Sequence, residues 1–325
     1  MKAQNDRQAG KELLNIGVDV GGTNIKFGVV DPNGKILFKK SIDTKSFMES
    51  AAMLNAIIEE INQLTTDAGI EWSDINSIGI GFPGTVEQET GIVVYAPNIQ
   101  WRNVAAVDFL KNHFDKGISI IQDSRASAWG EFQVGSGVGY SDMVSITLGT
   151  GIGCGMIIGG SIYHGGLNTA GEFGHHRIRK STRQCTCGRM GCLETYIGGP
   201  AIIKLAIKEK VFSGGLKGMD KAFSVSDVYE QAAEGNERAI LVANKVVEYL
   251  GTGLLNLINI MSPQLICLSG GISNAPDHLL LNPLMDLLEK EVYEPISKEV
   301  RLVKSLLGSD APLIGAALLY RNKLL

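Results

Sequence analysis

Residues 19–30 read Asp19-Val20-Gly21-Gly22-Thr23-Asn24-Ile25-Lys26-Phe27-Gly28-Val29-Val30, and this stretch separates the possible phosphate-binding folds. The apolar run before it, residues 13–20, predicts a buried strand that leads into the glycines. A dinucleotide-binding fold would open a helix at these glycines, and a P-loop would need Gly-Lys-Ser or Gly-Lys-Thr. Residues 25–30 instead predict a second strand, ending at the turn Asp31-Pro32-Asn33-Gly34. The pattern therefore argues against both of those folds.

The same pattern occurs a second time at residues 144–162. A predicted strand, 144–148, enters the turn Gly149-Thr150-Gly151-Ile152-Gly153, and two further short strands follow around Gly159-Gly160. Glycine has no Cβ, so such turns can point backbone N–H groups at phosphate oxygens. Two copies of one β unit predict two related halves, with a nucleotide bound in a cleft between them.

Composition limits the partners that this chain can have. A length of 325 residues with 44% hydrophobic content exceeds what one core usually serves, which predicts two domains. The net charge of −4 and the absence of a long basic run argue against nucleic acid or an anionic membrane. No apolar stretch has the length of a membrane span, and residues 1–15 are too polar for a signal peptide. We therefore expect a cytoplasmic protein that acts on small molecules.

Asp123 is the candidate catalytic carboxylate. Between the two β copies the periodicity predicts a helix at 50–68, a strand at 75–82 ending at Pro83-Gly84, a helix at 104–113 and a strand at 118–121. Asp123 follows that last strand and precedes a predicted helix at 124–132, the position where open α/β sheets bind ligands. The alternative is that Asp123 is an ordinary helix N-cap.

The C-terminal part contains a third glycine turn. Helices are predicted at 201–211, 226–234 and 239–261, followed by a strand at 264–268. That strand leads into Ser269-Gly270-Gly271-Ile272, which is either a backbone surface for a nucleoside or a plain strand-to-helix turn. A last apolar helix at 311–319 is expected to pack back on the first domain.

Three of the five cysteines form a cluster, Cys185, Cys187 and Cys192, with histidines ten and nine residues upstream of its first member. One nitrogen and three sulfurs make a closed tetrahedral set typical of structural zinc. Buried free thiols are the alternative, and a disulfide framework does not fit a reducing compartment. From the residues alone, either His175 or His176 could be the fourth ligand.

Together these motifs resemble the ROK family of bacterial sugar kinases, repressors and related open reading frames. The resemblance rests on residues 19–23, residues 148–153, Gly171-Glu172-Phe173-Gly174-His175, the cysteine spacing and residues 269–271. It implies an α/β fold of two actin-like ATPase domains, related to ribonuclease H, with a cleft between them and a zinc-binding knot. The expected small domain is 1–121, completed by 311–325. The expected large domain is 122–310, with the zinc site and the surface for a homodimer or homotetramer.

The resemblance also assigns roles to individual residues. Asp123 matches the catalytic base, and Asp19 matches the residue that orients Mg²⁺. ATP would contact Gly21, Gly22, Thr23, Lys26, Gly149, Thr150 and Gly151 through its phosphates, and Gly270 and Gly271 through its adenosine. The sugar would contact Gly84, Asn98, Gln122, Asp123, Glu172, His175 and Glu194. Structural Zn²⁺ would be held by His175, Cys185, Cys187 and Cys192, since the family pattern selects His175 over His176.

Within the family the chain is most similar to glucokinases, which implies ATP-dependent phosphorylation of the 6-hydroxyl of glucose. One departure concerns substrate choice, because Gln122 stands where the family usually has asparagine. N-acetylglucosamine, N-acetylmannosamine, fructose, mannose and allose are therefore alternatives. A sugar-sensing repressor is the rival from another class. We expect an enzyme instead, because about fifteen residues before the first strand are too few for a DNA-binding helix-turn-helix domain.

Overall fold

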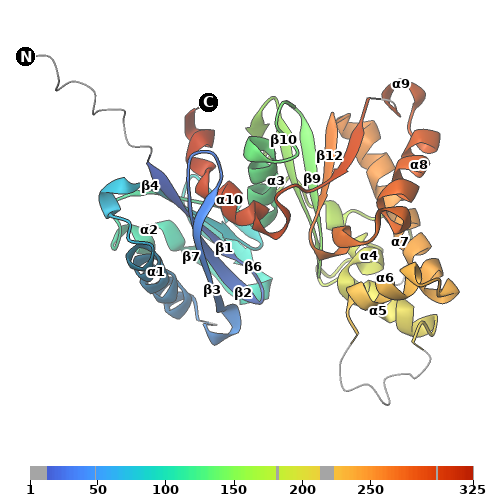
Figure 1. The fold of residues 1–325 in the computed structure, drawn as a ribbon, viewed down its shortest axis with the longest axis horizontal. Helices are drawn as coiled ribbons and strands as arrows, with labels where there is room; N and C mark the ends of the chain where they lie inside the picture. Colours follow the sequence, from blue (N-terminus) through green and yellow to red (C-terminus); the bar gives the residue numbers. More distant parts are fainter. Residues whose placement is uncertain (1–12, 48, 181–182, 213–222, 298, 325) are drawn as a thin grey trace, which may run out of the picture. The chain divides into compact units, whose positions relative to one another are not determined.

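The computed structural model describes residues 13–47, 49–180, 183–212, 223–297 and 299–324 (Figure 1). The chain divides into two compact units. The first contains the residues up to Val138, a short segment at Gly165–Thr169 and the residues from Asp310 onward. The second contains Gly139–His164 and Ala170–Ser309. None of the helices in the described part of the chain combines the length and the apolar character that crossing a membrane requires.

The first unit is built on a five-stranded sheet of order β3-β2-β1-β4-β8. Its strands are β1 (Leu14–Val20), β2 (Asn24–Val30), β3 (Ile36–Asp43), β4 (Ile75–Phe82) and β8 (Gly117–Gln122). β3, β2 and β1 are antiparallel neighbours, whereas β1, β4 and β8 are parallel. The apolar face packs against α1 (Ser50–Asp67) and α2 (Ala106–Lys111). A small antiparallel sheet of β5 (Thr85–Glu87), β6 (Ile92–Ala96) and β7 (Trp101–Ala105) follows β4.

Glycines let a helix lie directly on the backbone of this sheet. Gly17 of β1 pairs with Gly79 of β4, and a Cβ at these positions would lie 2.3 Å from Leu313 O and 1.8 Å from Ala316 O. Both oxygens belong to α10 (Ala311–Ala317), which also packs closely on α3 (Asp123–Val134). The division between the units falls after Val138, whereas we expected it after residue 121, because α3 packs on α10 within the first unit.

The second unit repeats the first sheet. Its order is β11-β10-β9-β12-β13, with two antiparallel pairings followed by two parallel ones. The strands are β9 (Met143–Leu148), β10 (Ile152–Ile158), β11 (Ser161–Ile162), β12 (Leu265–Ser269) and β13 (Arg301–Lys304). The sequence prediction of one β unit occurring twice is therefore confirmed.

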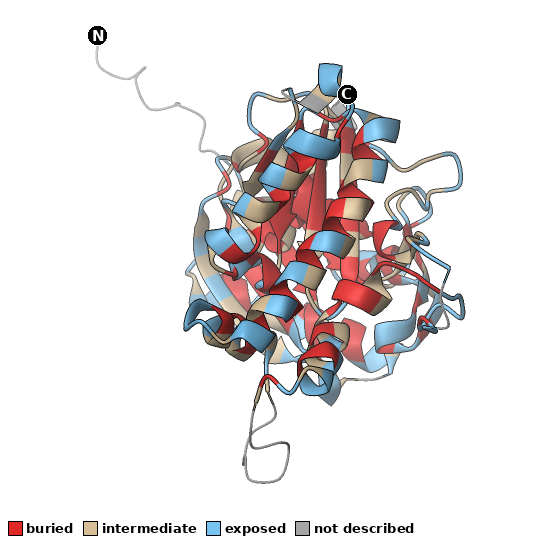
Figure 2. Cartoon of the chain, turned by 90° about the vertical axis from the view of Figure 1, so that its right-hand side faces the viewer, coloured by how far each residue is buried: buried red, intermediate tan, exposed pale blue. Residues whose placement is uncertain are grey.

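A large helical layer covers one face of the second sheet. Its helices are α4 (Glu194–Ile197), α5 (Gly199–Lys208), α6 (Val225–Ala233), α7 (Glu237–Met261), α8 (Leu281–Glu291) and α9 (Glu294–Ser297). Side chains of α5, α6, α7 and α8 form one buried cluster with β9, β10 and β12. Figure 2 shows the result, since the helices carry exposed residues on their outer faces and the buried strands lie behind them.

The third glycine turn does not lead directly into an α-helix, as the alternative of a strand-to-helix turn would require. Residues Gly271–Asn274 form a short 3-10 turn, and α8 begins only at Leu281. Pro276 explains the interruption, because the residue before a proline is driven away from helical backbone angles. Ala275 is accordingly extended, with φ −50° and ψ 147°.

Candidate active site and metal centre

The turn between β1 and β2 presents a buried carboxylate beside exposed glycine backbone. Asp19 has a side chain only 11% exposed, and Lys26 Nζ lies 3.7 Å from its Oδ2. Burial raises the pKa of Asp19 above its usual value, and the nearby Lys26 opposes that rise. Gly21 N–H donates to Asn24 O over 3.0 Å, while Gly22 and Thr23 are exposed. A buried carboxylate of this kind suits a bound cation.

Thr44 holds this turn in place, and sequence reasoning did not single it out. Its Oγ1 donates to Gly21 O over 2.8 Å, and its N–H donates to Thr23 O over 2.9 Å. Thr44 follows β3, so its contact with the turn depends on β3 pairing with β2. No local pattern in the sequence reveals such a contact.

Asp123 lies where β8 ends and α3 begins. Gln122 is the N-cap of α3 and makes no capping hydrogen bond, so the alternative that Asp123 is the N-cap is wrong. Asp123 is the first helical residue, and its Oδ1 accepts from Ser124 N–H over 2.6 Å. Both Gln122 and Asp123 are half-buried, at the carboxyl end of a parallel strand.

Gly84 and Asn98 follow other strands of the first unit. Gly84 has φ +88°, and a Cβ there would lie 2.2 Å from Tyr95 O, so the fold itself requires glycine. Asn98 is exposed in a short 3-10 turn between β6 and β7. Its side chain is therefore available to a ligand.

The turn between β9 and β10 is tied to the start of α4 and α5. Gly149 N–H donates to Gly151 O over 3.0 Å, and Gly199 N–H donates to Gly149 O over 2.9 Å. Glu194 Oε2 accepts from Ile152 N–H over 3.0 Å. A Cβ on Gly151 would lie 2.7 Å from that same Oε2, so the carboxylate packs directly on the turn. Thr150 and Gly151 remain exposed.

The third glycine turn lies at the same edge of the second sheet. Thr147 Oγ1 and Ser269 Oγ are 3.1 Å apart, which joins the ends of β9 and β12. Gly270 has φ +85° and a Cβ there would lie 2.4 Å from Leu148 O, whereas Gly271 is exposed with open space around it. Two of the three predicted nucleotide turns are thus brought together within one unit.

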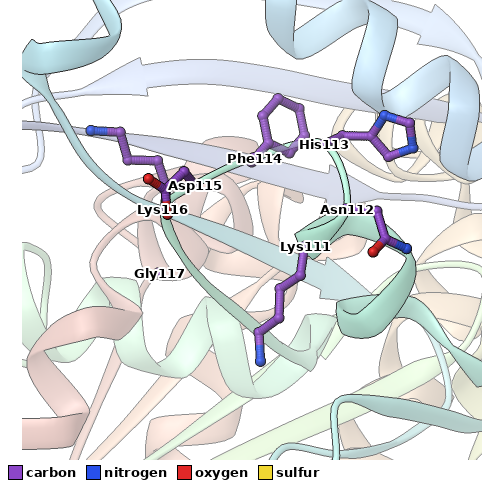
Figure 3. A pocket seen from close by; sticks show the side chains of 7 residues that line it. All are labelled: Lys111, Asn112, His113, Phe114, Asp115, Lys116 and Gly117. Atoms are coloured by element: carbon purple, nitrogen blue, oxygen red, sulfur yellow. The ribbon is translucent and has the colours of Figure 1, made fainter.

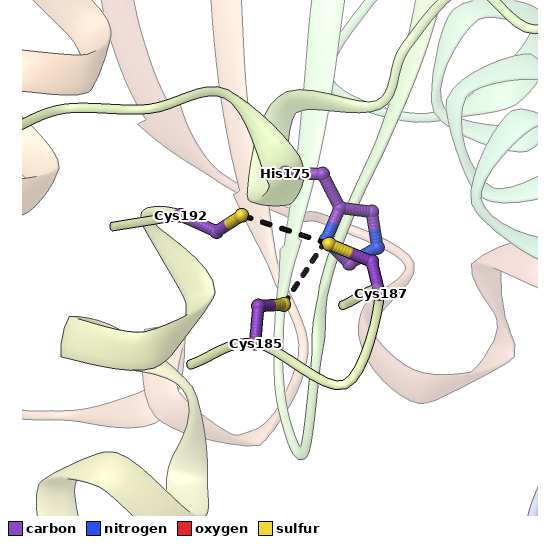
Figure 4. A group of neighbouring side chains, drawn as sticks. All are labelled: His175, Cys185, Cys187 and Cys192. Atoms are coloured by element: carbon purple, nitrogen blue, oxygen red, sulfur yellow. Dashed lines mark hydrogen bonds between the residues drawn. The ribbon is translucent and has the colours of Figure 1, made fainter. Parts of the chain in front are cut away.

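The four predicted metal ligands also converge, although they span residues 175–192 (Figure 4). Their ligand atoms all lie within 4.8 Å of one another. Cys187 Sγ is 3.7 Å from Cys192 Sγ, and Cys185 Sγ is 3.5 Å from His175 Nδ1. A tetrahedral zinc with Zn–S bonds of about 2.3 Å places two sulfurs about 3.8 Å apart, so the donor set fits zinc. The donor atoms are three thiols and one imidazole nitrogen.

His175 faces the cluster with one ring nitrogen and a carboxylate with the other. Its Nε2 lies 3.9 Å from Glu172 Oε2, and Glu172 is exposed. The competing ligand, His176, instead packs its ring on Phe173 with centroids 4.8 Å apart. Glu194 reaches the cluster from the other direction, with Oε1 3.9 Å from Cys185 Sγ. The cluster therefore contacts two carboxylates that the sequence assigned to the sugar.

The remaining cysteines and a surface pocket lie apart from these residues. Cys154 and Cys267 are fully buried in β10 and β12, as core positions. A pocket in the first unit is formed by residues 111–117, the end of α2 and the loop that follows it (Figure 3). None of the predicted site residues lines that pocket.

Comparisons with known proteins identify the family. The model of the ROK family matches residues 15–323, so the chain belongs to the ROK family. It is 32% identical over 314 residues to a glucokinase of Halalkalibacterium halodurans, covering 95% of each chain. A ROK family glucokinase structure from Streptomyces griseus, in complex with glucose and AMPPNP, has a TM-score of 0.81 and 30% identity, covering 94% of this chain and 98% of that one. The fold is therefore the actin-like ATPase type of ROK sugar kinases.

The family also contains regulators, and some of them are similar to this chain. A xylose repressor of Caldicellulosiruptor bescii is 28% identical over 306 residues, which cover 92% of this chain and 76% of the repressor. The chain is thus a ROK family protein of the sugar-kinase type with glucokinases among its relatives.

Proposed function

We propose that this protein is an ATP-dependent hexose kinase that phosphorylates the 6-hydroxyl of its sugar, with glucose preferred. The observation that carries the proposal is the position of Asp123, at the carboxyl end of β8 in a chain related to glucokinases over 95% of its length. As general base, Asp123 takes the proton from the 6-hydroxyl while that oxygen attacks the γ-phosphorus of ATP in line, the bond from this phosphorus to the bridging oxygen breaks, and ADP leaves.

Phosphoryl transfer needs mainly positioning and neutralisation of charge. Backbone N–H groups of the three glycine turns hold the phosphates and the adenosine, and Lys26 adds a positive charge beside Asp19. Asp19 would hold Mg²⁺, which would supply positive charge to neutralise the phosphates. The proposed sugar contacts are Gly84, Asn98, Gln122, Glu172, His175 and Glu194. Carboxylates and amides suit this work because they replace the water around a polyol.

The cysteine cluster has a structural role in this proposal. Zinc held by His175 and the three cysteines would fix the ring of His175, whose other nitrogen faces Glu172. We further propose that the enzyme works in the cytoplasm as a homodimer or homotetramer, through a surface of the larger domain.

The test is a coupled assay of ADP release with Mg-ATP across glucose, mannose, fructose, allose, xylose, N-acetylglucosamine and N-acetylmannosamine. We expect the highest kcat/KM with glucose. A higher kcat/KM with a different sugar would support the kinase activity and contradict the preference for glucose. Gln122→Asn restores the residue that the family usually has, so it reports whether Gln122 sets the ratio of kcat/KM between glucose and the next best sugar.

A sugar-sensing regulator is the second candidate, favoured by the similarity to a xylose repressor. Calorimetry with the same sugars separates the two functions. Sugar binding without ADP release on any sugar would contradict the kinase and support the regulator.

A further inference from the structure

Arg125 is a buried arginine whose charged group clasps a distant segment of the chain. It lies in the first turn of α3, two residues after Asp123, and is only 2% exposed. Its Nη1 donates to Asn168 Oδ1 over 3.0 Å, and its Nη2 donates to Asn168 O over 2.9 Å. Two parallel hydrogen bonds from a planar guanidinium fix direction as well as distance. Burying an arginine is unfavourable unless such hydrogen bonds are made, so the bonds to Asn168 offset the cost of burying Arg125.

Asn168 is held from a second side as well. Its Nδ2 donates to Val86 O over 2.7 Å, and its N–H donates to Gly165 O over 3.2 Å. Its backbone is left-handed, with φ +55°, a conformation that asparagine tolerates better than most residues. The segment Gly165–Thr169 belongs to the first unit, although the chain on both sides of it belongs to the second. Arg125, Asn168 and Val86 thus form one hydrogen-bonded bridge.

Each member of the bridge is close in sequence to a proposed sugar contact. Arg125 follows Asp123 by two residues, Val86 follows Gly84 by two, and Asn168 precedes Glu172 by four. Only Thr169, Ala170 and Gly171 separate Asn168 from Glu172. Errors of about 1 Å in placing a reacting group can lower a rate by about 100-fold. A rigid link between the segments that carry Asp123 and Gly84 therefore bears directly on how the sugar is held.

We propose that Arg125 and Asn168 are positioning residues for the sugar, which act by fixing the segments that carry Asp123 and Gly84 within the first unit. This inference rests on the proposed sugar-kinase function. The nucleotide contacts are in the glycine turns, and none of the bridge residues belongs to those turns. Loss of the bridge therefore affects the sugar more than ATP.

Asn168→Gly is the sharpest test, because glycine adopts φ +55° without strain while both side-chain hydrogen bonds are lost. We expect the KM and the calorimetric Kd for the sugar to rise about tenfold, while the KM for ATP changes less than twofold. Asn168→Asp keeps the acceptor for Arg125 and loses the donor to Val86, so its effect is smaller. Arg125→Lys removes the paired geometry and resembles Asn168→Gly.

Asn103→Gly is the matched control, since Asn103 is an exposed, left-handed asparagine of β7 with φ +47°. We expect wild-type constants from it. An unchanged sugar Kd in folded Asn168→Gly overturns the proposal, and so does an equal loss of sugar and ATP affinity with a lower Tm, the signature of a structural role alone. If the wild type turns over no sugar, the proposed kinase function is wrong. The change in sugar Kd between wild type and Asn168→Gly then tests the positioning role by itself. A wild type that neither binds nor phosphorylates any of the sugars overturns both.

Discussion

Asp19 and Thr147 occupy the same place in the two sheets and have opposite chemistry. Asp19 pairs with Lys26 on β2 and Gly81 on β4, and Thr147 pairs with Gly153 on β10 and Ser269 on β12. The first position holds a buried carboxylate beside a lysine, and the second holds two neutral hydroxyls 3.1 Å apart. The repeated backbone therefore supplies the same glycine turn twice, and only the first turn has a buried carboxylate beside it.

The two units also differ in what surrounds their turns. In the first, α10 lies on glycines of β1 and β4, and Thr44 supports the turn. In the second, Glu194 links the turn to the cysteine cluster, through Ile152 N–H on one side and Cys185 on the other. The first turn is thus supported by Thr44, whereas the second is supported by a carboxylate next to the cysteine cluster.

The largest effect is expected at Asp123, which directly follows β8. The equivalent strand of the second sheet, β13, ends at Lys304 and is followed by Ser305. Asp123→Asn should lower kcat about 1,000-fold, because removing a general base costs about 100- to 10,000-fold. Sugar Kd measured by calorimetry should stay within a few-fold of wild type, since the amide is isosteric. Substantial remaining turnover would refute the assignment of Asp123 as the base.

A loss of about 100-fold in kcat/KM is expected for Asp19→Asn, with a much smaller loss for Thr147→Val in the second unit. Although Asp19→Asn should lower activity, it should leave the stability of the folded state at neutral pH unchanged or raise it. Because burial raises its pKa, the folded state holds this proton more tightly than the unfolded state, and the ionised form lowers stability at neutral pH. The contribution of Asp19 to the free energy of unfolding therefore rises as the pH falls from its folded-state pKa towards 3.8, the ordinary pKa of an aspartate.

Thermal unfolding tests whether ionised Asp19 lowers the stability of the folded state at neutral pH. Asp19→Asn should melt at or above the wild-type temperature at pH 7, and should lose that part of the pH dependence of Tm. A clearly lower Tm at pH 7 would show that the pair with Lys26 outweighs the burial of Asp19.

Gly79→Ala should destabilise the first unit by about 2 kcal/mol or more, because the new Cβ would collide with Ala316 O in α10. Cys267 occupies the equivalent position on β12, and Cys267→Ala should cost about 1 kcal/mol as a buried deletion. Denaturant unfolding of both variants and the wild type measures the two changes in the free energy of unfolding. Equal costs would show that the close approach of α10 is not what requires glycine.

The smallest effect is expected from removing the zinc proposed at the cysteine cluster. Chelation should weaken sugar binding about tenfold, because His175 and Cys185 lie next to the two carboxylates Glu172 and Glu194. Calorimetry with protein verified as metal-free by elemental analysis measures it, and restored zinc should reverse the change. An unchanged sugar Kd in the metal-free protein would show that the metal does not position the sugar contacts.

Local patterns predicted most strands of the two five-stranded sheets, but not β13 or the small sheet of β5, β6 and β7. The strand predicted at 75–82 is β4 residue for residue, and the helix predicted at 50–68 differs from α1 by one residue. An α-helix does not follow Gly271 directly, because the residue before Pro276 is driven away from helical backbone angles. Thr44, Arg125 and Asn168 escaped notice because their contacts join segments far apart in the chain.

The sequence by itself determined the two β copies, the cysteine spacing and the carboxylate after β8, because glycine turns, strand periodicity and ligand spacing are local properties. It could not choose between His175 and His176 without the family pattern, and it could not show which of two successive residues caps α3. The tertiary structure decided both, together with the clasp of Arg125 on Asn168 and the burial of Asp19. These features depend on which backbone atoms approach one another in space, and that is settled only when the sheets and helices pack.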